Sequence, residues 1–194
     1  VTFNALLDGS GNNLTVTGNA VFEDDLSDIA VLYVSGTTAF NAASITTTGN
    51  QTYNGNVTLG ANAVITADNA GTAQTVRFNG NVDGGETWSL TINDNAVFGN
   101  DAGDSVSGIT ILYVAGNAEY NSALSSIGTL TVEGNAEINN TINTASSIQV
   151  NGTTAINTTT ITTTGTQEYT GDVTLGADAV LTGTLVTFTG QILG

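Results

Sequence analysis

The side chains with the clearest potential for chemistry are carboxylates that gather in two short stretches. Each stretch follows an apolar phrase that ends in phenylalanine, at Phe22 and at Phe98, so we expect both stretches at the same corner of corresponding structural units. Clustered hard oxygen ligands on a loop suit Ca²⁺, which takes about six to eight of them. The calcium candidates are Asp24, Asp25 and Asp28 in the first stretch and Asp101 and Asp104 in the second.

The alternative for these stretches is a pair of solvated loops, since the sequence does not require any cofactor. Two weaker acidic segments, residues 8–12 and 83–86, are rich in glycine and are better interpreted as turns.

Catalytic chemistry is disfavoured by the composition. The chain has no histidine, no cysteine and no lysine, and its single basic residue is Arg77. Serine and cysteine nucleophiles need an adjacent base, and enzymes that hold acidic sugars generally need cations as well. We therefore predict a non-enzymatic protein. The remaining catalytic alternative is a pair of carboxylates that cleaves polysaccharide.

Four aromatic residues could form a patch on which a carbohydrate stacks, if they lie on the surface. Tyr33 and Tyr113 have the phase of outward-facing residues and Tyr120 that of an inward-facing one, while Trp88 lies outside the pattern. Core packing or ordinary exposure is the alternative for all four.

The charge of the chain excludes several partners. Seventeen acidic residues and one basic residue give a net charge of −16, which would repel nucleic acid and anionic membrane surfaces. No apolar stretch reaches the roughly 18 residues of a membrane-spanning helix. The absence of cysteine leaves the redox compartment open.

A nine-residue phrase, L-x-V-x-G-N-A-x-F, dominates the organisation of the chain. Its starting residues are often 18 apart, a period too short for helical repeats and typical of one coil of a β-solenoid. Proline, which cannot donate to a central strand, is absent. The phrase begins at Leu14, Leu32, Leu90, Leu112, Leu130 and Ile148.

Within each phrase apolar and polar residues alternate, as in strands with one face in the core. Glycine and asparagine fall between the two halves, where a corner needs residues that tolerate positive φ. The third position of the phrase predicts one inward column along about ten coils of 18 to 19 residues. Its members are Phe3, Val16, Val34, Tyr53, Phe78, Ile92, Val114, Val132, Val150, Tyr169 and Phe188.

A longer repeat lies above the coil. Residues 46–66 return as residues 162–182, and a V-x-F phrase begins at Val1, Val76 and Val186. These starts divide one continuous solenoid, residues 1–194, into superrepeats 1–75 and 76–185, with a third beginning at 186. We expect a segment cut from a longer array, whose ends stack on further repeats or on other copies of the chain.

The phrase T-T-G-x-Q-x-Y-x-G-x-V-T-L-G-A-[ND]-A-V-[IL]-T, at Thr47 to Thr66 and Thr163 to Thr182, resembles repeats of large bacterial surface proteins. These are the filamentous-haemagglutinin-like, β-strand-repeat adhesins. The resemblance implies a right-handed parallel β-helix, export to the cell surface, and a role as a stalk or fibre in adhesion or biofilm. Surface carbohydrate or other cells would then be partners.

Two alternatives remain, one for the handedness of the β-helix and one for the function of the chain. Apolar residues recur every six positions from Leu112 to Ile148, which is typical of a left-handed β-helix, although irregular coil lengths favour the right-handed form. The second alternative concerns function: the chain could be a subunit of an extracellular filament or surface layer that stacks end to end.

Overall fold

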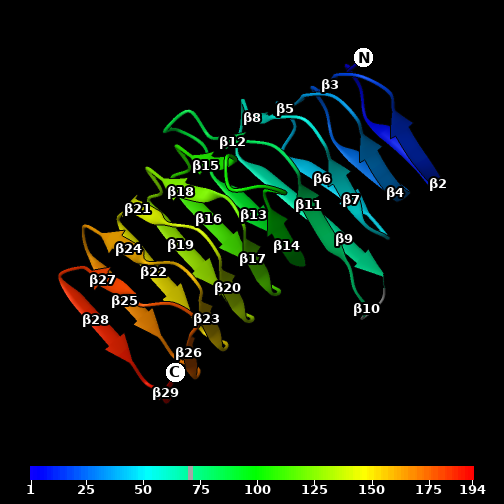
Figure 1. The fold of residues 1–194 in the computed structure, drawn as a ribbon. Helices are drawn as coiled ribbons and strands as arrows, with labels where there is room; N and C mark the ends of the chain where they lie inside the picture. The colour runs from blue at the N-terminus through cyan, green and yellow to red at the C-terminus, as the bar shows by residue number, and fades with distance from the viewer. Residues whose placement is uncertain (70–71) are drawn as a thin grey trace.

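The computed structural model describes residues 1–69 and 72–194, and these residues form a parallel β-solenoid without helices. The coils stack along one axis, with the two termini at opposite ends (Figure 1). The all-β solenoid predicted from the 18-residue period is therefore confirmed, with ten coils whose lengths range from 17 to 27 residues between paired positions. Coil follows coil across the superrepeat boundary at residues 75 and 76, because β11 pairs with β7 before it and β14 after it.

Each coil has three sides, and each side is a ladder of parallel strands. Side one is a ten-stranded sheet. Its strands are β1 (Thr2–Phe3), β3 (Ala20–Phe22), β5 (Thr38–Phe40), β8 (Val57–Leu59), β12 (Val82–Asp83), β15 (Ser105–Ser107), β18 (Ala123–Ser125), β21 (Ile142–Ala145), β24 (Thr160–Thr163) and β27 (Val180–Thr182).

Side two follows side one along the chain, and side three completes the coil. Side two contains β6 (Ser44–Thr47), β9 (Ala63–Asn69), β13 (Leu90–Ile92), β16 (Ile111–Val114), β19 (Thr129–Val132), β22 (Ser147–Val150), β25 (Thr166–Tyr169) and β28 (Leu185–Phe188). Side three contains β7 (Gln51–Tyr53), β11 (Thr75–Phe78), β14 (Asn95–Phe98), β17 (Ala118–Tyr120), β20 (Ala136–Ile138), β23 (Thr154–Ile156), β26 (Val173–Leu175) and β29 (Ile192–Leu193).

Three strands depart from this plan. β2 (Leu7–Val16) and β4 (Leu26–Val34) each run through the corner between sides two and three, where their mutual register is irregular. β10 (Thr72–Ala73) pairs antiparallel with the end of β9, so the chain leaves the coil there in a short excursion. All other strand pairs among the described residues are parallel.

The predicted single inward column is wrong, because its members lie on three different sides. Phe3 lies on side one and pairs with Phe22, whereas Phe78 lies on side three and pairs with Phe98. Ile92 lies on side two. The two shortest steps of the predicted column, 13 residues from Phe3 to Val16 and 14 from Phe78 to Ile92, are therefore moves of two sides and not complete coils.

The physical reason is that a superrepeat is not a whole number of coils. From Phe3 to Phe78 the chain completes three coils and two further sides, and from Phe78 to Phe188 it completes five coils and two further sides. The same V-x-F phrase consequently appears on side one, then side three, then side two. Residues at six-residue spacing from Leu112 likewise mark successive sides, so this spacing reports the three-sided coil. The preference for a right-handed winding stays a prediction.

The core is a set of stacked side chains inside the three ladders. Aromatic rings stack through its first half with centroid separations of 5.1 to 6.0 Å. The stack moves from side one to side three between Phe40 and Tyr53, whose rings meet edge to face. It continues through Phe78 and Phe98 to Tyr120, and Tyr169 stacks on Phe188 near the other end.

Corner glycines serve a different purpose from the one predicted. Gly18 does adopt a positive φ of 112°, but Gly134 and Gly152 do not. Gly134 N–H donates to the carbonyl of Gly116 in the previous coil at 3.1 Å, and a Cβ at Gly134 would lie 2.5 Å from that oxygen. Close approach of stacked backbones therefore requires glycine at these corners.

Corner asparagines form ladders of hydrogen bonds along the stack. The side-chain oxygen of Asn95 accepts a hydrogen bond from the backbone N–H of Asn117 at 2.8 Å, and Asn117 does the same for Asn135. Each asparagine thus satisfies a backbone donor that the corner leaves outside the strand ladders.

We predict that Val132→Asp destabilises the solenoid by at least about 3 kcal/mol, because it places an unpaired carboxylate in the core. Val132 is fully buried, and its neighbours in the ladder are Val114 and Val150. Thermal unfolding followed by circular dichroism measures the effect. Thr131→Asp makes the same charge change on the outward side of the same strand and should alter the melting temperature little. Equal melting temperatures for Val132→Asp and the unsubstituted chain would contradict the assignment.

Candidate functional sites

The first group of calcium candidates lies where the chain passes from side one to side two. Asp24 is exposed and accepts a hydrogen bond from the backbone N–H of Asp25 at 2.8 Å. The Asp25 carboxylate accepts the N–H of Ser44, in the next coil, at 2.9 Å. Asp28 is exposed, within β4, with a left-handed φ of 52°. The carboxylates of Asp24 and Asp25 therefore help to satisfy backbone donors at the corner.

The second group lies where the chain passes from side three to side one, between β14 and β15. Asp104 accepts the backbone N–H groups of Asn100 and Asp101 at 3.0 and 3.3 Å, and Asp101 accepts that of Gly103 at 2.7 Å. The bond between Asp101 and Gly103 has the spacing of an Asx turn, and the two bonds to Asp104 close the loop on itself.

The expectation that both groups share one corner is wrong. The phrase ending at Phe22 lies on sides three and one, whereas the phrase ending at Phe98 lies on sides two and three. The second acidic group is therefore displaced by one side around the axis. Across residues 1–69 and 72–194 no three carboxylates, histidines or cysteines are arranged to hold a metal ion.

Of the two weaker acidic segments, residues 83–86 lead into a turn after β12, as predicted, and Asp83 accepts the N–H of Gly85 at 2.9 Å. Residues 8–12 instead lie within β2, where Ser10 and Gly11 have positive φ and Asp8 accepts the N–H of Ser10 at 2.8 Å.

The four aromatic residues do not form a common patch. Tyr33 faces outward on side three and its hydroxyl accepts a hydrogen bond from Asn54, whereas Tyr113 faces outward on side two. Tyr120 is fully buried, and Trp88 packs partly against the core. The predicted inward and outward phases of the three tyrosines are confirmed, but the ladders separate their rings.

Sequence reasoning missed a buried polar network that the Q-x-Y phrase builds. Gln51 is fully buried, and its side-chain amide donates to the carbonyl of Thr66 at 2.9 Å and to the hydroxyl of Thr47 at 3.1 Å. The hydroxyl of Tyr53 donates to the side-chain oxygen of Gln51 at 2.6 Å. Burial raises the pKa of Tyr53 well above its usual range, so this hydroxyl stays protonated.

The same network occurs again five coils and two sides later, on side two. Gln167 donates to the carbonyl of Thr182 at 2.9 Å and accepts the hydroxyl of Tyr169 at 3.1 Å. The signal in the sequence was a glutamine at the place where the other phrases have leucine. A buried amide needs such partners, because leaving it unpaired costs about 1 to 3 kcal/mol.

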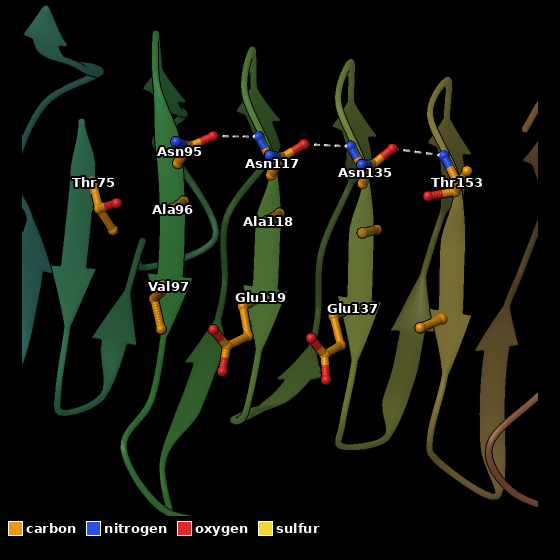
Figure 2. A pocket seen from close by; sticks show the side chains of 12 residues that line it. Thr75, Asn95, Ala96, Val97, Asn117, Ala118, Glu119, Asn135, Glu137 and Thr153 are labelled. Carbon is orange, nitrogen blue, oxygen red and sulfur yellow. Dashed lines mark hydrogen bonds between the residues drawn. The ribbon is translucent and has the colours of Figure 1, made fainter. Parts of the chain in front are cut away.

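A shallow trough on side three is the most regular polar feature of the surface (Figure 2). Asn95, Asn117 and Asn135 lie along one wall, and Glu119 and Glu137 lie along the other. Glu119 and Glu137 occupy paired positions on neighbouring strands, and each accepts a hydrogen bond from an asparagine side chain. The trough can therefore accept and donate hydrogen bonds, and it adds negative charge to an already acidic surface.

The only basic residue does not complete a reaction centre with these carboxylates. Arg77 is exposed on the same outer row, two strands from Glu119, with Val97 between them. This arrangement offers hydrogen bonding along a face of the solenoid but no histidine or lysine to act as a base, since the chain contains neither.

Comparisons with known proteins leave the family open. No family model matches the chain, and no curated protein or solved structure is significantly similar to it. Among the described residues there is no helix long and apolar enough to cross a membrane.

We predict that two Tyr→Phe substitutions, each of which removes one buried phenolic hydroxyl, have different effects on stability. Tyr53→Phe leaves the buried oxygen of Gln51 without its donor and should destabilise the chain by about 1 to 3 kcal/mol. Tyr120→Phe removes a buried hydroxyl that has no hydrogen-bond partner, so it should be neutral or stabilising. Denaturant unfolding of both variants measures the difference. Equal losses would show that the network adds no stability beyond ring packing.

We predict that calcium does not bind in a saturable way at about 1 mM, the affinity range of extracellular calcium modules. The two groups lie at different corners, and the carboxylates of Asp25, Asp101 and Asp104 are bonded to backbone donors. Isothermal titration with CaCl₂, compared with MgCl₂ at equal ionic strength, tests this. Saturable heat together with a calcium-specific rise in melting temperature would restore the calcium hypothesis.

Proposed function

We propose that this chain is a non-catalytic length of stalk or fibre in an extracellular bacterial adhesin or related surface protein. The observation that carries the proposal is the unbroken stacking of ten coils around one continuous core. Such a stack grows along one axis and therefore spans distance, here about 50 Å at about 4.8 Å per coil. The resemblance of the T-T-G-x-Q-x-Y phrase to surface-adhesin repeats supports the extracellular location.

A stalk needs resistance to extension and a surface that keeps neighbouring molecules apart. Strand pairs between successive coils supply the resistance to extension, because each coil between the first and the last is hydrogen-bonded to the coils on either side of it. The net charge of −16 supplies the second through mutual repulsion. The outer rows remain available for contact with carbohydrate or with other cells.

The catalytic alternative, cleavage of polysaccharide, would have to use the paired carboxylates of Glu119 and Glu137. Both are bonded to asparagine side chains, and no cation lies beside them in the trough. We therefore favour the structural role. Reproducible release of reducing ends from acidic or neutral polysaccharides would overturn it.

We predict that the chain resists stretching as a folded body when handles pull on its two ends. Single-molecule force measurements should show discrete unfolding events that together release about 600 Å of chain. Val132→Asp should lower the unfolding force, whereas Thr131→Asp should leave it near that of the unsubstituted chain. Smooth extension without events, as for a disordered linker, would contradict the stalk role.

A further inference from the structure

Three asparagine–glycine pairs occupy corners of the solenoid, at residues 54–55, 79–80 and 151–152. This dipeptide is prone to spontaneous deamidation, because glycine has no side chain to hinder the attack of its backbone nitrogen on the asparagine side chain. The reaction needs no enzyme, metal or basic side chain, so it is open to a chain that lacks histidine and lysine. Its rate depends on how firmly each corner holds the two reacting groups.

We propose that Asn151 is a site of spontaneous deamidation that is closed while the coils are stacked and reacts when they separate. We further infer that the product opposes restacking, so that the modification is a one-way record of coil opening. The inference concerns the chemistry of the chain itself and does not depend on the proposed stalk role.

The stacked structure holds both reacting groups of this pair. The nucleophile is the backbone nitrogen of Gly152, whose N–H donates to the carbonyl of Gly134 in the previous coil at 3.1 Å. The electrophile is the side-chain amide of Asn151. Its nitrogen donates to the carboxylate of Glu133 at 2.6 Å, and its oxygen accepts a hydrogen bond from the side chain of Gln149 at 3.1 Å. Ring closure must break the bond from Gly152 and release the amide from Glu133, so it requires local opening of the coil.

The reaction balances with water as the only reagent. The nitrogen of Gly152 loses its proton to solvent and attacks Cγ of Asn151, and the bond from Cγ to Nδ2 breaks as ammonia leaves. Water then opens the resulting succinimide at either of its carbonyls. Opening at Cγ gives aspartate, whereas opening at the main-chain carbonyl gives isoaspartate, which adds one methylene to the backbone. Either product replaces a neutral amide with a carboxylate.

The new carboxylate meets another carboxylate when the coils stack again. The side-chain nitrogen that donated to Glu133 becomes a charged oxygen, so a hydrogen bond to a charged group is lost. Two like charges then face each other across one strand spacing, about 4.8 Å. In isoaspartate the added methylene also displaces Gly152 from a corner in which even a Cβ would meet the carbonyl of Gly134. The modified coil therefore stacks less well than the original one.

Asn54 provides a contrast within the same chain. Gly55 donates to the carbonyl of Gly36 at 3.2 Å, so stacking protects this pair in the same way. The side chain of Asn54 donates to the hydroxyl of Tyr33 and accepts from Asn79 at 2.7 Å, and neither partner is a carboxylate. An aspartate here can still accept from Asn79, and the Tyr33 hydroxyl can rotate to donate to it. Deamidation at Asn54 is therefore closed by stacking, but its product does not repel the neighbouring coil.

Deamidation rates test the protection. The folded chain and the chain unfolded in urea are incubated in the same mildly alkaline buffer, and modified molecules are counted by mass spectrometry. Trypsin can cut only after Arg77, so one fragment carries Asn54 and the other carries Asn151, which tandem spectra distinguish from Asn79. Deamidation of Asn151 should be at least about tenfold slower in the folded chain, because it must wait for local opening. A folded-state rate within about twofold of the unfolded rate would overturn the proposal.

Substitutions that reproduce the charge of the product test the repulsion. Asn151→Asp should lower the melting temperature by about 2 to 4 °C, whereas Asn54→Asp should change it by less than about 1 °C. Glu133→Gln removes the facing charge, so in that background Asn151→Asp should cost less than about 1 °C. Equal losses for Asn151→Asp and Asn54→Asp would contradict the one-way character of the site. A loss from Asn151→Asp that persists in full beside Glu133→Gln would contradict it as well.

Discussion

The structure depends on the pairing of each coil with the next, because no coil can satisfy its own backbone. The N–H and C=O groups of side two bond almost entirely to residues about 18 to 27 positions away, and the corners follow the same rule. This constraint excludes proline, which has no N–H to donate. It also requires glycine where the backbones of successive coils approach closely at a corner. Gly134 illustrates the second point, since the carbonyl of Gly116 occupies the space that a Cβ would need. The residue type at such a corner is thus constrained by the backbone of the adjacent coil.

A consequence is that the three sides are interchangeable. The phrase L-x-V-x-G-N-A-x-F crosses from side three to side one at Leu14 and from side two to side three at Leu112. The Q-x-Y phrase likewise builds one polar network on side three, around Gln51, and the same network on side two, around Gln167. Superrepeats that end two sides beyond a whole coil are tolerated because each phrase carries its own corner and its own core residues. A feature that belongs to one phrase therefore moves around the axis from one superrepeat to the next.

This interchangeability also explains what the sequence could and could not predict. Alternation and the 18-residue period predict the parallel solenoid and the inward phase of Val132 and Tyr120, because both follow from local geometry. The side on which a phrase lies depends on the summed length of all preceding coils, including the antiparallel pair of β9 and β10 and the loop at residues 99–104. The assignment of Asp24 and Asp101 to one corner failed for that reason. The burial of the glutamines could have been predicted, since Gln51 occupies the ladder position that Leu14 and Leu32 occupy in the preceding coils.

Function must then be carried by the outward rows, which the coil pairing leaves free to vary. On side three this row contains Thr52, Arg77, Val97, Glu119 and Glu137 in successive coils, a mixture that no core requirement would select. The inward row that follows it, with Tyr53, Phe78, Phe98, Tyr120 and Ile138, is aromatic or aliphatic. Because an outward substitution does not disturb the ladder, such a solenoid can change its surface while keeping its length and stiffness. The separation of a constant interior from a variable exterior suits the proposed stalk role, under which specificity for a partner would lie in outward rows like the one that lines the trough.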